Sequence, residues 1–262
     1  MLVARMRPGG LAPGHEPGLW LALGDGLAQF LRGAAGGEAW LCGGSALVLS
    51  GEPVADLNYA LIGPGADAPA LLRRFAAELR RRGLPAWIQV DAGVAAGLGQ
   101  LRDELGLTDA GWSPVMVRGS QPVAAGSSEF AVEEVSGRAQ LQDACTVIAA
   151  AFGFPPAAAE RAFGTRLISY PAADIWLARY GGQAIAAAIT TRTGSSVGLW
   201  AMATRPDRQR QGAGAALLGH LIRHHLRLGA RSFFLLATPA GRPLYRRFAF
   251  QTAGQLADWA TG

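Results

Sequence analysis

The segment that decides the fold is Thr204–Leu218, TRPDRQRQGAGAALL. An apolar strand pattern ends at its first residue, a Pro-Asp pair interrupts the pattern, and an amphipathic helix pattern begins directly after the glycines. The first turn of a helix has backbone N–H groups without intrahelical partners, and the helix dipole adds partial positive charge there. Gly212 and Gly214 carry no side chain that would keep a phosphate from this backbone. The segment therefore predicts a pyrophosphate site at a helix start, with added charge from Arg208 and Arg210.

Two other phosphate-binding motifs are excluded by the same segment. A P-loop needs Gly-x-x-x-x-Gly-Lys-Ser/Thr, and the chain contains no lysine. The dinucleotide fingerprint needs a third glycine where this chain has Leu217. A Gly-x-Gly before a helix is a weak signal by itself, and an ordinary glycine-rich turn is the alternative.

The segment resembles the signature of the Gcn5-related N-acetyltransferase (GNAT) family, Gln/Arg-x-x-Gly-x-Gly/Ala, which Gln209, Gly212 and Gly214 match. The resemblance extends over Pro206–Leu218 and, in element order, from about residue 130 to the end. It implies acetyl-CoA as co-substrate, with pantetheine in a gap beside the preceding strand. The strand residues implied to contact pantetheine are Ala201, Met202, Ala203 and Thr204. The residues implied to hold the pyrophosphate are Gln209, Arg210, Gln211, Gly212, Ala213, Gly214 and Ala215. Thr238 stands where relatives often carry an asparagine that contacts the cofactor.

A second motif lies in residues 237–250, ATPAGRPLYRRFAF. The family usually has a short helix here that ends Tyr-x-x-x-Gly-Phe, and this chain has Ala249 in place of the glycine. The resemblance implies that Tyr245 is the general acid, because the thiolate that leaves a thioester needs a proton and a phenol can supply it. An aromatic side chain that only packs on the sheet edge is the alternative. The substitution at Ala249 costs little if its backbone avoids a positive φ.

The general base and any metal site are not apparent. The strand over Ser196–Thr204, where many relatives carry an acid, has none, and Asp174 is as consistent with a solvated turn. An ordered water or a neutral amine are alternatives to an acidic base. His220, His224 and His225 share one helix without the glutamate of a His-Glu-x-x-His site, so we predict that they belong to a solvated helix face or to the helix C-terminus and bind no metal.

The elements predict an α/β fold made of two GNAT-like mixed-sheet domains in tandem, of which the C-terminal one is intact. From residue 130 the expected order is β-α-α-β-β-β-α-β-α-β, with a hairpin at Gly181–Gly182. Similar outlines in the two halves suggest an old duplication. The predicted boundaries are a flexible arm over 1–18, a degenerate domain over 19–118, a linker over 119–128 and an acetyltransferase domain over 129–262.

The first half lacks the signature. Its equivalent loop, Gly63–Ala70, has two prolines and Asp67, which remove N–H donors and repel phosphate. We therefore expect this half to leave CoA to the second half and to form one wall of the acceptor site. Candidates for that wall, each also explicable as core or turn, are Asp56, Asn58, Trp40, Trp87 and Trp112.

Composition limits the partners. The net charge of +5 comes from arginine alone, which with abundant Ala and Gly indicates a GC-rich bacterial genome more than nucleic-acid binding. No apolar stretch is long enough to span a membrane, and no secretory signal is apparent, which predicts a cytoplasmic protein. Cys42 and Cys145 are expected to be buried structural thiols.

These features together predict an acetyl-CoA-dependent N-acetyltransferase, a monomer or homodimer, that acts by direct attack of a small-molecule or peptide amine. A CoA-binding sensor without catalysis is the alternative, favoured by the missing base and opposed by Tyr245. A pure interaction module is the third possibility, and the intact phosphate loop argues against it.

Overall fold

The computed structural model describes residues 16–31, 37–64, 67–124 and 129–261. Its helices are α1 (Glu16–Phe30), α2 (Ala68–Arg82), α3 (Ala92–Ala95), α4 (Gly99–Glu104), α5 (Arg138–Phe152), α6 (Pro156–Ile168), α7 (Ala213–Arg227) and α8 (Arg242–Arg247). Its strands are β1 (Glu38–Cys42), β2 (Ser45–Leu49), β3 (Asn58–Ile62), β4 (Trp87–Asp91), β5 (Thr108–Gly119), β6 (Ala131–Glu134), β7 (Ala173–Tyr180), β8 (Gln183–Thr193), β9 (Ser196–Thr204), β10 (Ser232–Leu236) and β11 (Gln251–Ala260). Short 3₁₀ turns, η1 (Ala55–Leu57) and η2 (Pro206–Arg208), precede β3 and follow β9.

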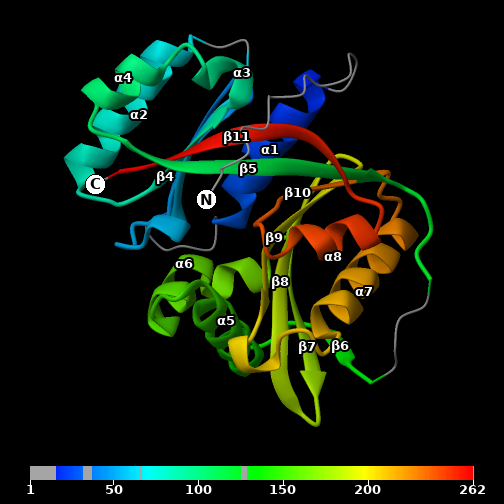
Figure 1. The fold of residues 1–262 in the computed structure, drawn as a ribbon. Coiled ribbons are helices and arrows are strands. Elements are labelled where there is room, and N and C mark those ends of the chain that lie inside the picture. The colour runs from blue at the N-terminus through cyan, green and yellow to red at the C-terminus, as the bar shows by residue number, and fades with distance from the viewer. Residues whose placement is uncertain (1–15, 32–36, 65–66, 125–128, 262) are drawn as a thin grey trace, which may run out of the picture.

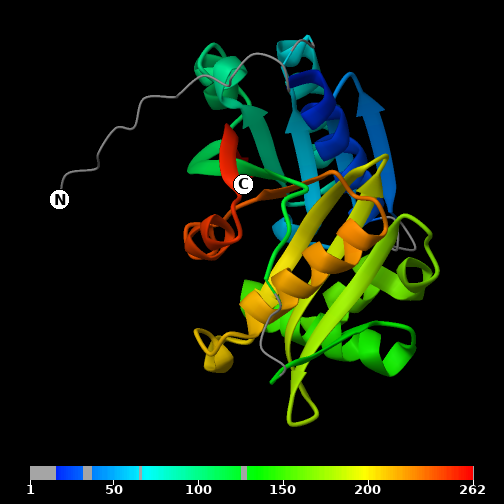
Figure 2. The same cartoon turned by 90° about the vertical axis from the view of Figure 1, so that its right-hand side faces the viewer.

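All these strands form one eleven-stranded mixed sheet, in the order β1-β2-β3-β4-β11-β5-β10-β9-β8-β7-β6. Figure 1 shows the N-terminal half, in blue and cyan, above the C-terminal half, in yellow and orange, with β5 and β11 running side by side between them. Figure 2 shows the same two halves from the side, with the blue and cyan half again above the yellow and orange half. The prediction of an α/β mixed sheet in two related halves is confirmed.

The two halves exchange their last strands. β5 leaves the first half to pair antiparallel with β10 of the second, and β11 leaves the second half to pair antiparallel with β4 of the first. β5 and β11 also pair with each other, from Gln251↔Val117 to Ala260↔Thr108. Each half therefore contains a strand that the chain contributes from the other half, and the backbone hydrogen bonds at the centre of the sheet join the two.

Helix α1 joins the halves on one face of the sheet. It packs on β2 of the first half and on β8 and β9 of the second, and β9, the nearer of these two to β2, is six positions from it in the sheet order. A helix of this length spans about 22 Å, whereas six steps across a flat sheet are about 29 Å. The sheet must therefore curve around α1. Phe30 stacks on Trp200 with ring centroids 5.6 Å apart, and a Cβ added at Gly26 would lie 3.0 Å from Trp200.

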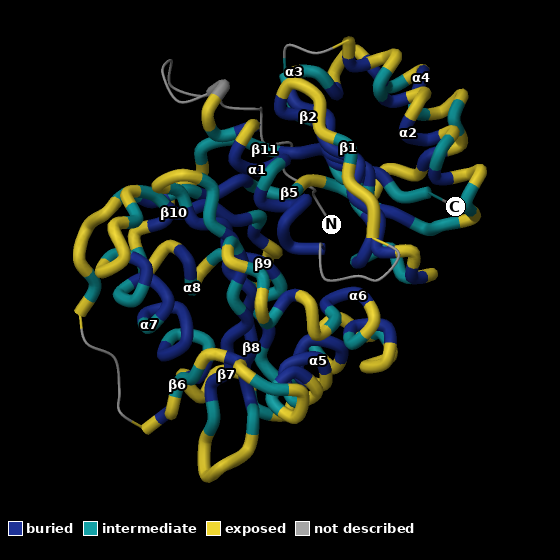
Figure 3. Tube along the Cα trace, turned by 180° about the vertical axis from the view of Figure 1, so that it is seen from behind, coloured by how far each residue is buried: buried dark blue, intermediate teal, exposed yellow. Residues whose placement is uncertain are grey.

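Two further groups of helices complete the layers. Helices α5 and α6 share one continuous core with α1, whereas α7 and α8 pack on the opposite face and α2, α3 and α4 cover that same face in the first half. The exposed residues lie on the outer parts of these helices and at the sheet edges, as Figure 3 shows from behind.

The expected order of elements in the second half is confirmed from β6 to β11. The hairpin prediction holds because Gly181 and Gly182 both have positive φ, 54° and 81°, as a two-residue turn between twisted strands requires. In the first half the sequence pattern indicates a strand only over Val115–Arg118, part of the much longer β5, and gives no signal for β1 or α3. The missing part of β5 contains Gly111 and Pro114, which weaken a strand pattern and which pairing with β11 overrides.

The domain boundaries remain a prediction. Residues 1–15 of the expected arm and 125–128 of the expected linker lie outside the described residues, and residues 16–18 begin α1. No helix in the parts of the chain that the structure describes is both long and apolar enough to cross a membrane.

The condition under which alanine at position 249 would cost little is not met. Ala249 has φ 61°, and it follows Phe248, the residue that caps the C-terminal end of α8. The Ala249 N–H donates to the Arg246 carbonyl, and the Phe250 N–H reaches back to the carbonyl of Tyr245. In this paired hydrogen-bond pattern the residue after the C-cap is normally glycine, because a left-handed backbone conformation costs any other residue about 1–2 kcal/mol of stability.

We expect Ala249→Gly to raise the free energy of unfolding by roughly 0.5–1 kcal/mol, the relief of the left-handed strain less the greater chain entropy of glycine. The measurement is chemical or thermal unfolding of the wild type and the variant. Ala240→Gly is the matched control, an exposed turn residue without a positive φ, and it should not stabilise. A variant at Ala249 that is less stable than the wild type would show that the turn carries no strain.

Candidate functional site

The predicted phosphate loop is an open helix start. Gly212 caps α7 with φ 95° and ψ −11°, and no side chain caps the first turn. The first α-helical hydrogen bond runs from the Ala216 N–H to the Gly212 carbonyl, so the N–H groups of the residues between them have no acceptor within the helix. Arg210 also has a left-handed φ, 61°, which is costly for an arginine and typical of strained functional turns. Such turns and an uncapped helix start suit an anion.

A gap opens beside this loop, between β9 and β10. The parallel pairing of the two strands ends at Leu235↔Leu199, whereas β9 stays paired with β8 as far as Thr204↔Ala186. At Ala201, which has φ 46°, β9 bulges by one residue against β8. The β10-facing edge of β9 is therefore open over residues 200–204, which include the four strand positions expected to contact pantetheine.

Helix α8 closes the far side of the gap. A Cβ added at Gly214 would lie 3.3 Å from Thr204 Oγ1 and 3.6 Å from Leu244 Cδ2, so the phosphate loop, the end of β9 and α8 meet at this glycine. The sequence analysis did not single out Leu244, since a leucine on a short helix carries no functional signal. Thr238 accepts a hydrogen bond from the Gly241 N–H, 3.1 Å, at the start of α8.

The structure places Tyr245 on α8, beside the gap. Its side chain is buried at 7% exposure, and its ring meets Phe250 edge-on with centroids 5.9 Å apart. Burial raises the pKa of the Tyr245 phenol to about 12. The hydroxyl is therefore protonated at neutral pH, which is the form that a general acid needs.

The charge around the loop is positive. Asp207 lies in the loop, but Arg205 holds its carboxylate through two 3.0 Å hydrogen bonds and Arg208 approaches it to 3.7 Å. The hydrogen bonds from Arg205, with its charge and that of Arg208, lower the pKa of Asp207. Arg210 is exposed, and Gln209 turns its amide towards the Thr204 carbonyl at 3.5 Å. Arginine at a helix start favours phosphate recognition.

In the first half, the start of the corresponding helix, α2, is capped by the side chain of Asp67. The Asp67 carboxylate accepts a hydrogen bond from the Ala70 N–H and caps α2, and a proline follows in the first turn. A Cβ added at Gly63 would lie 2.9 Å from the Gly44 carbonyl oxygen, so this glycine serves packing. The helix start of the first half is thus occupied by a negative charge, in agreement with the sequence argument.

The five expected wall residues do not form one surface. Asn58 is fully buried and holds the turn before β3 through carbonyls of Glu52, Val54 and Pro85, which is a structural role. The Trp87 indole donates to the Asp56 carboxylate, 3.2 Å. Trp112 is exposed on β5. Trp40 lines a groove elsewhere.

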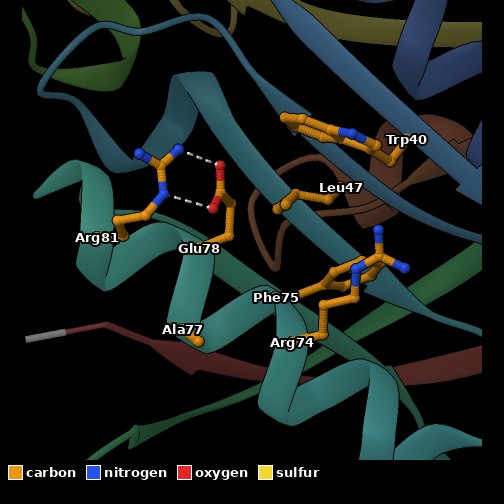
Figure 4. Close-up of a pocket in the computed structure, with 7 residues that line it drawn as sticks. All are labelled: Trp40, Leu47, Arg74, Phe75, Ala77, Glu78 and Arg81. Atoms are coloured by element: carbon orange, nitrogen blue, oxygen red, sulfur yellow. Dashed lines mark hydrogen bonds and ion pairs between the residues drawn. The ribbon is translucent and has the colours of Figure 1, made fainter.

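That groove lies on the outer surface of the first half, between α2 and the strands β1 and β2 (Figure 4). Figure 4 shows Glu78 and Arg81 on α2 joined by two hydrogen bonds on one side of the groove, with Trp40 and Leu47 across from them. Its lining residues are Trp40, Leu47, Arg74, Phe75, Ala77, Glu78 and Arg81. It contains no residue of the phosphate loop or of the gap.

One of the simpler expectations is corrected. Cys145 is buried, but Cys42 is exposed, because β1 is an edge strand that the sequence did not reveal. Of the three histidines, His224 and His225 lie in the last turn of α7, at the helix C-terminus. His225 is fully buried, with Nε2 3.1 Å from Thr190 Oγ1 and no partner for Nδ1 among the described residues. In the same part of the chain no group of three or more His, Cys, Asp or Glu side chains is arranged for a metal ion.

Asp174, a weak candidate for the general base, is engaged in a structural cluster. Its carboxylate accepts from Arg192 and from the Thr190 hydroxyl, 3.3 Å, beneath the C-terminal end of α7. The phosphate loop is at the other end of that helix. The structure therefore does not bring Asp174 to the gap.

Residues 171–252 match the family model described as an acetyltransferase (GNAT) domain. A search of the curated proteins finds no match. Among solved structures, a GCN5-related N-acetyltransferase from Kribbella flavida is similar with a TM-score of 0.69 and 17% identity, covering 95% of this chain and 96% of that one. A second, from Sphaerobacter thermophilus, has a TM-score of 0.61 and 16% identity over 83% and 80% of the two chains. A tandem GNAT protein from the clavulanic acid biosynthesis pathway has a TM-score of 0.56 and 14% identity over 98% and 90%.

The matched segment, which contains the gap, the phosphate loop and α8, is similar to the GNAT acetyltransferase domain. The chain as a whole has the fold of a tandem GNAT protein. This family and fold imply acyl transfer from an acyl-CoA.

The buried histidine generates a prediction about pH. Burial, with the charges of His224 and Arg192 and the neighbouring His220, lowers the pKa of His225 to about 3. An unfolded histidine titrates near 6.5, so below that pH the unfolded chain binds a proton that the folded chain does not. The free energy of unfolding is therefore not affected by this proton above pH 6.5. It falls as the pH drops below 6.5, by about 1.4 kcal/mol at pH 5.5.

We expect His225→Gln to remove this loss, so that its melting temperature falls less than that of the wild type between pH 7.5 and 5.5. His220→Gln, at a partly exposed ring on the same helix, is the control and should retain most of the pH dependence. Equal slopes for the wild type and His225→Gln would mean that His225 does not titrate differently in the two states.

Proposed function

We propose that the protein is an N-acetyltransferase that moves the acetyl group of acetyl-CoA to a primary amine of a small molecule or peptide by direct attack. The observation that carries the proposal is the coincidence of three features at one glycine, Gly214: the uncapped start of α7, the open edge of β9 and the helix that bears Tyr245. A family domain over the same segment supports it. The proposal includes a cytoplasmic location and a monomer or homodimer.

In this proposal different residues around the gap bind different parts of the cofactor. The N–H groups at the start of α7, with Gln209 to Ala215, bind the pyrophosphate, and the open edge of β9 at Ala201 to Thr204 hydrogen-bonds pantetheine. Thr238 lies at the start of α8 and lines the same end of the gap. Pantetheine enters the gap from the side of the sheet that α7 covers, so the thioester at its end reaches the sheet. The amine then arrives from the other side, which α1 covers.

The chemical step is attack of the amine nitrogen on the thioester carbonyl. A C–N bond forms, the C–S bond breaks, the nitrogen loses a proton, and the departing sulfur gains one. Tyr245 is placed to donate that proton, since its phenol is neutral and its ring is fixed by packing on Phe250. Stabilising the charge that develops on sulfur lowers the barrier without tighter binding of the ground state.

A CoA-binding sensor is the second candidate. The absence of an acid on β9 favours it, whereas a buried tyrosine on α8, at the position of the family's general acid, favours catalysis. Acetyl transfer to a panel of amines separates the two, since a sensor binds CoA and transfers nothing.

Tyr245→Phe removes one hydroxyl and keeps the ring, so packing survives. We expect acetyl transfer to slow by on the order of 10²-fold, while the dissociation constant of acetyl-CoA changes much less. The measurements are the steady-state rate with an accepted amine and a direct binding titration. Hydrolysis of acetyl-CoA serves as the readout where no amine has yet been found.

Tyr180→Phe is the control, because the Tyr180 side chain is exposed at the end of β7 and the variant keeps its ring contact with Phe130. It should leave both quantities unchanged. A Tyr245→Phe rate within about twofold of the wild type would remove Tyr245 from the mechanism, and equal losses of rate and binding would make it a cofactor contact.

A further inference from the structure

Strand β11 brings an acidic side chain to the face of the sheet opposite α7 and α8. Leu256 lies in the core beneath α1, whereas Ala257 and Trp259 lie in the core beneath α2. Because side chains alternate along a strand, Asp258 shares the α1 side with Leu256. Sequence analysis could not find this residue, since it lies near the end of the last strand and outside every motif of the family.

Asp258 is held by side chains from two other strands. The Ser113 hydroxyl of β5 donates to Asp258 Oδ2 at 2.5 Å, and the Gln89 amide of β4 donates to Oδ1 at 2.9 Å. These strands flank β11 in the sheet, so the three side chains meet only because β11 is inserted between them. The carboxylate is therefore fixed in orientation by both of its oxygens.

This cluster has an excess of hydrogen-bond acceptors. No arginine or histidine forms an ion pair with Asp258 among the described residues, and burial raises the pKa of its carboxyl despite the two hydrogen bonds. Gln89 is 7% exposed, and its Oε1 has no hydrogen-bond partner in the described part of the chain. A buried amide oxygen without a donor and a half-buried carboxylate without a cation both cost stability. An ammonium group, with three donors and a positive charge, satisfies both.

The cluster lies close to the end of the gap. β5 pairs with β10 as far as Val115↔Leu236, and Ser113 is two residues further along β5, a distance of about 7 Å. Tyr59, half-buried on the same face, is near enough that Asp258 and Asp56 raise the pKa of its phenol, after the larger effect of burial. An acceptor that reached the gap from the α1 side would meet these groups.

We propose that Asp258, oriented by Ser113 and Gln89, binds one ammonium group of a small diamine or polyamine-like acceptor while a second amine of that molecule reaches the thioester. The proposal rests on the acetyltransferase function proposed above. Asp258 is thus an acceptor-binding residue. It lies on β11, between β4 and β5, where the two halves of the sheet join.

The test compares butane-1,4-diamine with butylamine, which differ by the anchoring ammonium. For the wild type we expect kcat/KM to favour the diamine by at least tenfold, mostly through KM. In Asp258→Asn this preference should disappear while CoA binding, measured by calorimetry, is unchanged, and Asp258→Glu should restore part of it. Asp109→Asn is the matched control: Asp109 is an exposed carboxylate on β5 that pairs with Arg102, and its loss should leave the preference intact.

Each remaining outcome is decisive. A wild-type enzyme that acetylates amines but shows no diamine preference would overturn the acceptor proposal alone, as would a preference that survives in Asp258→Asn. A wild-type protein that binds CoA but transfers acetyl to no amine would be the sensor described above, and the acceptor proposal would fall together with the function. A wild-type protein that fails to bind CoA would also overturn the function on which the proposal rests.

Discussion

The insertion of β11 between β4 and β5 is the constraint on which the rest of the structure depends. Its backbone hydrogen bonds run along both neighbours, from Leu256↔Asp91 on β4 and from Gln251↔Val117 on β5. Because β5 in turn pairs with β10, the centre of the sheet cannot be separated into two halves without exposing unpaired strand edges. The chain therefore has two structurally related halves but one cooperative sheet, and α1 reinforces the union by packing across both.

The same exchange shapes the site. Antiparallel pairing with β5 fixes β10 on its outer side, whereas the parallel pairing of β10 with β9 stops at Leu199. The gap is thus held open between a strand anchored to the first half and a strand anchored to β8. The first half contributes to the proposed chemistry in two ways: β5 holds β10 in place, and Ser113 and Gln89 orient Asp258. The start of its own helix α2 is capped by Asp67.

Sequence reasoning went furthest where local chemistry decides structure. Glycines, a Pro-Asp break and helical periodicity placed α7 and its loop, and two glycines placed the hairpin between β7 and β8. It failed where distant pairing decides: β1 has exposed side chains and gains its conformation from β2, and the outer part of β5 gains its conformation from β11. The positive φ of Ala249 and the burial of His225 were likewise invisible, because each depends on neighbours that the chain meets only on folding. The roles assigned to the loop, strand and tyrosine residues remain predictions.

The central claim is that one cofactor site exists, at the start of α7 and the gap beside it. Calorimetric titration of the full chain with CoA tests it most directly, with Gly214→Val as the variant, because added methyl groups there press on Thr204 and Leu244 and narrow the gap. Gly137→Val is the control, a glycine that caps α5 in an extended conformation with open space around it. The account predicts one CoA bound per chain, lost in Gly214→Val and kept in Gly137→Val. Two equivalent sites, no binding, or unchanged affinity in a folded Gly214→Val protein would contradict it.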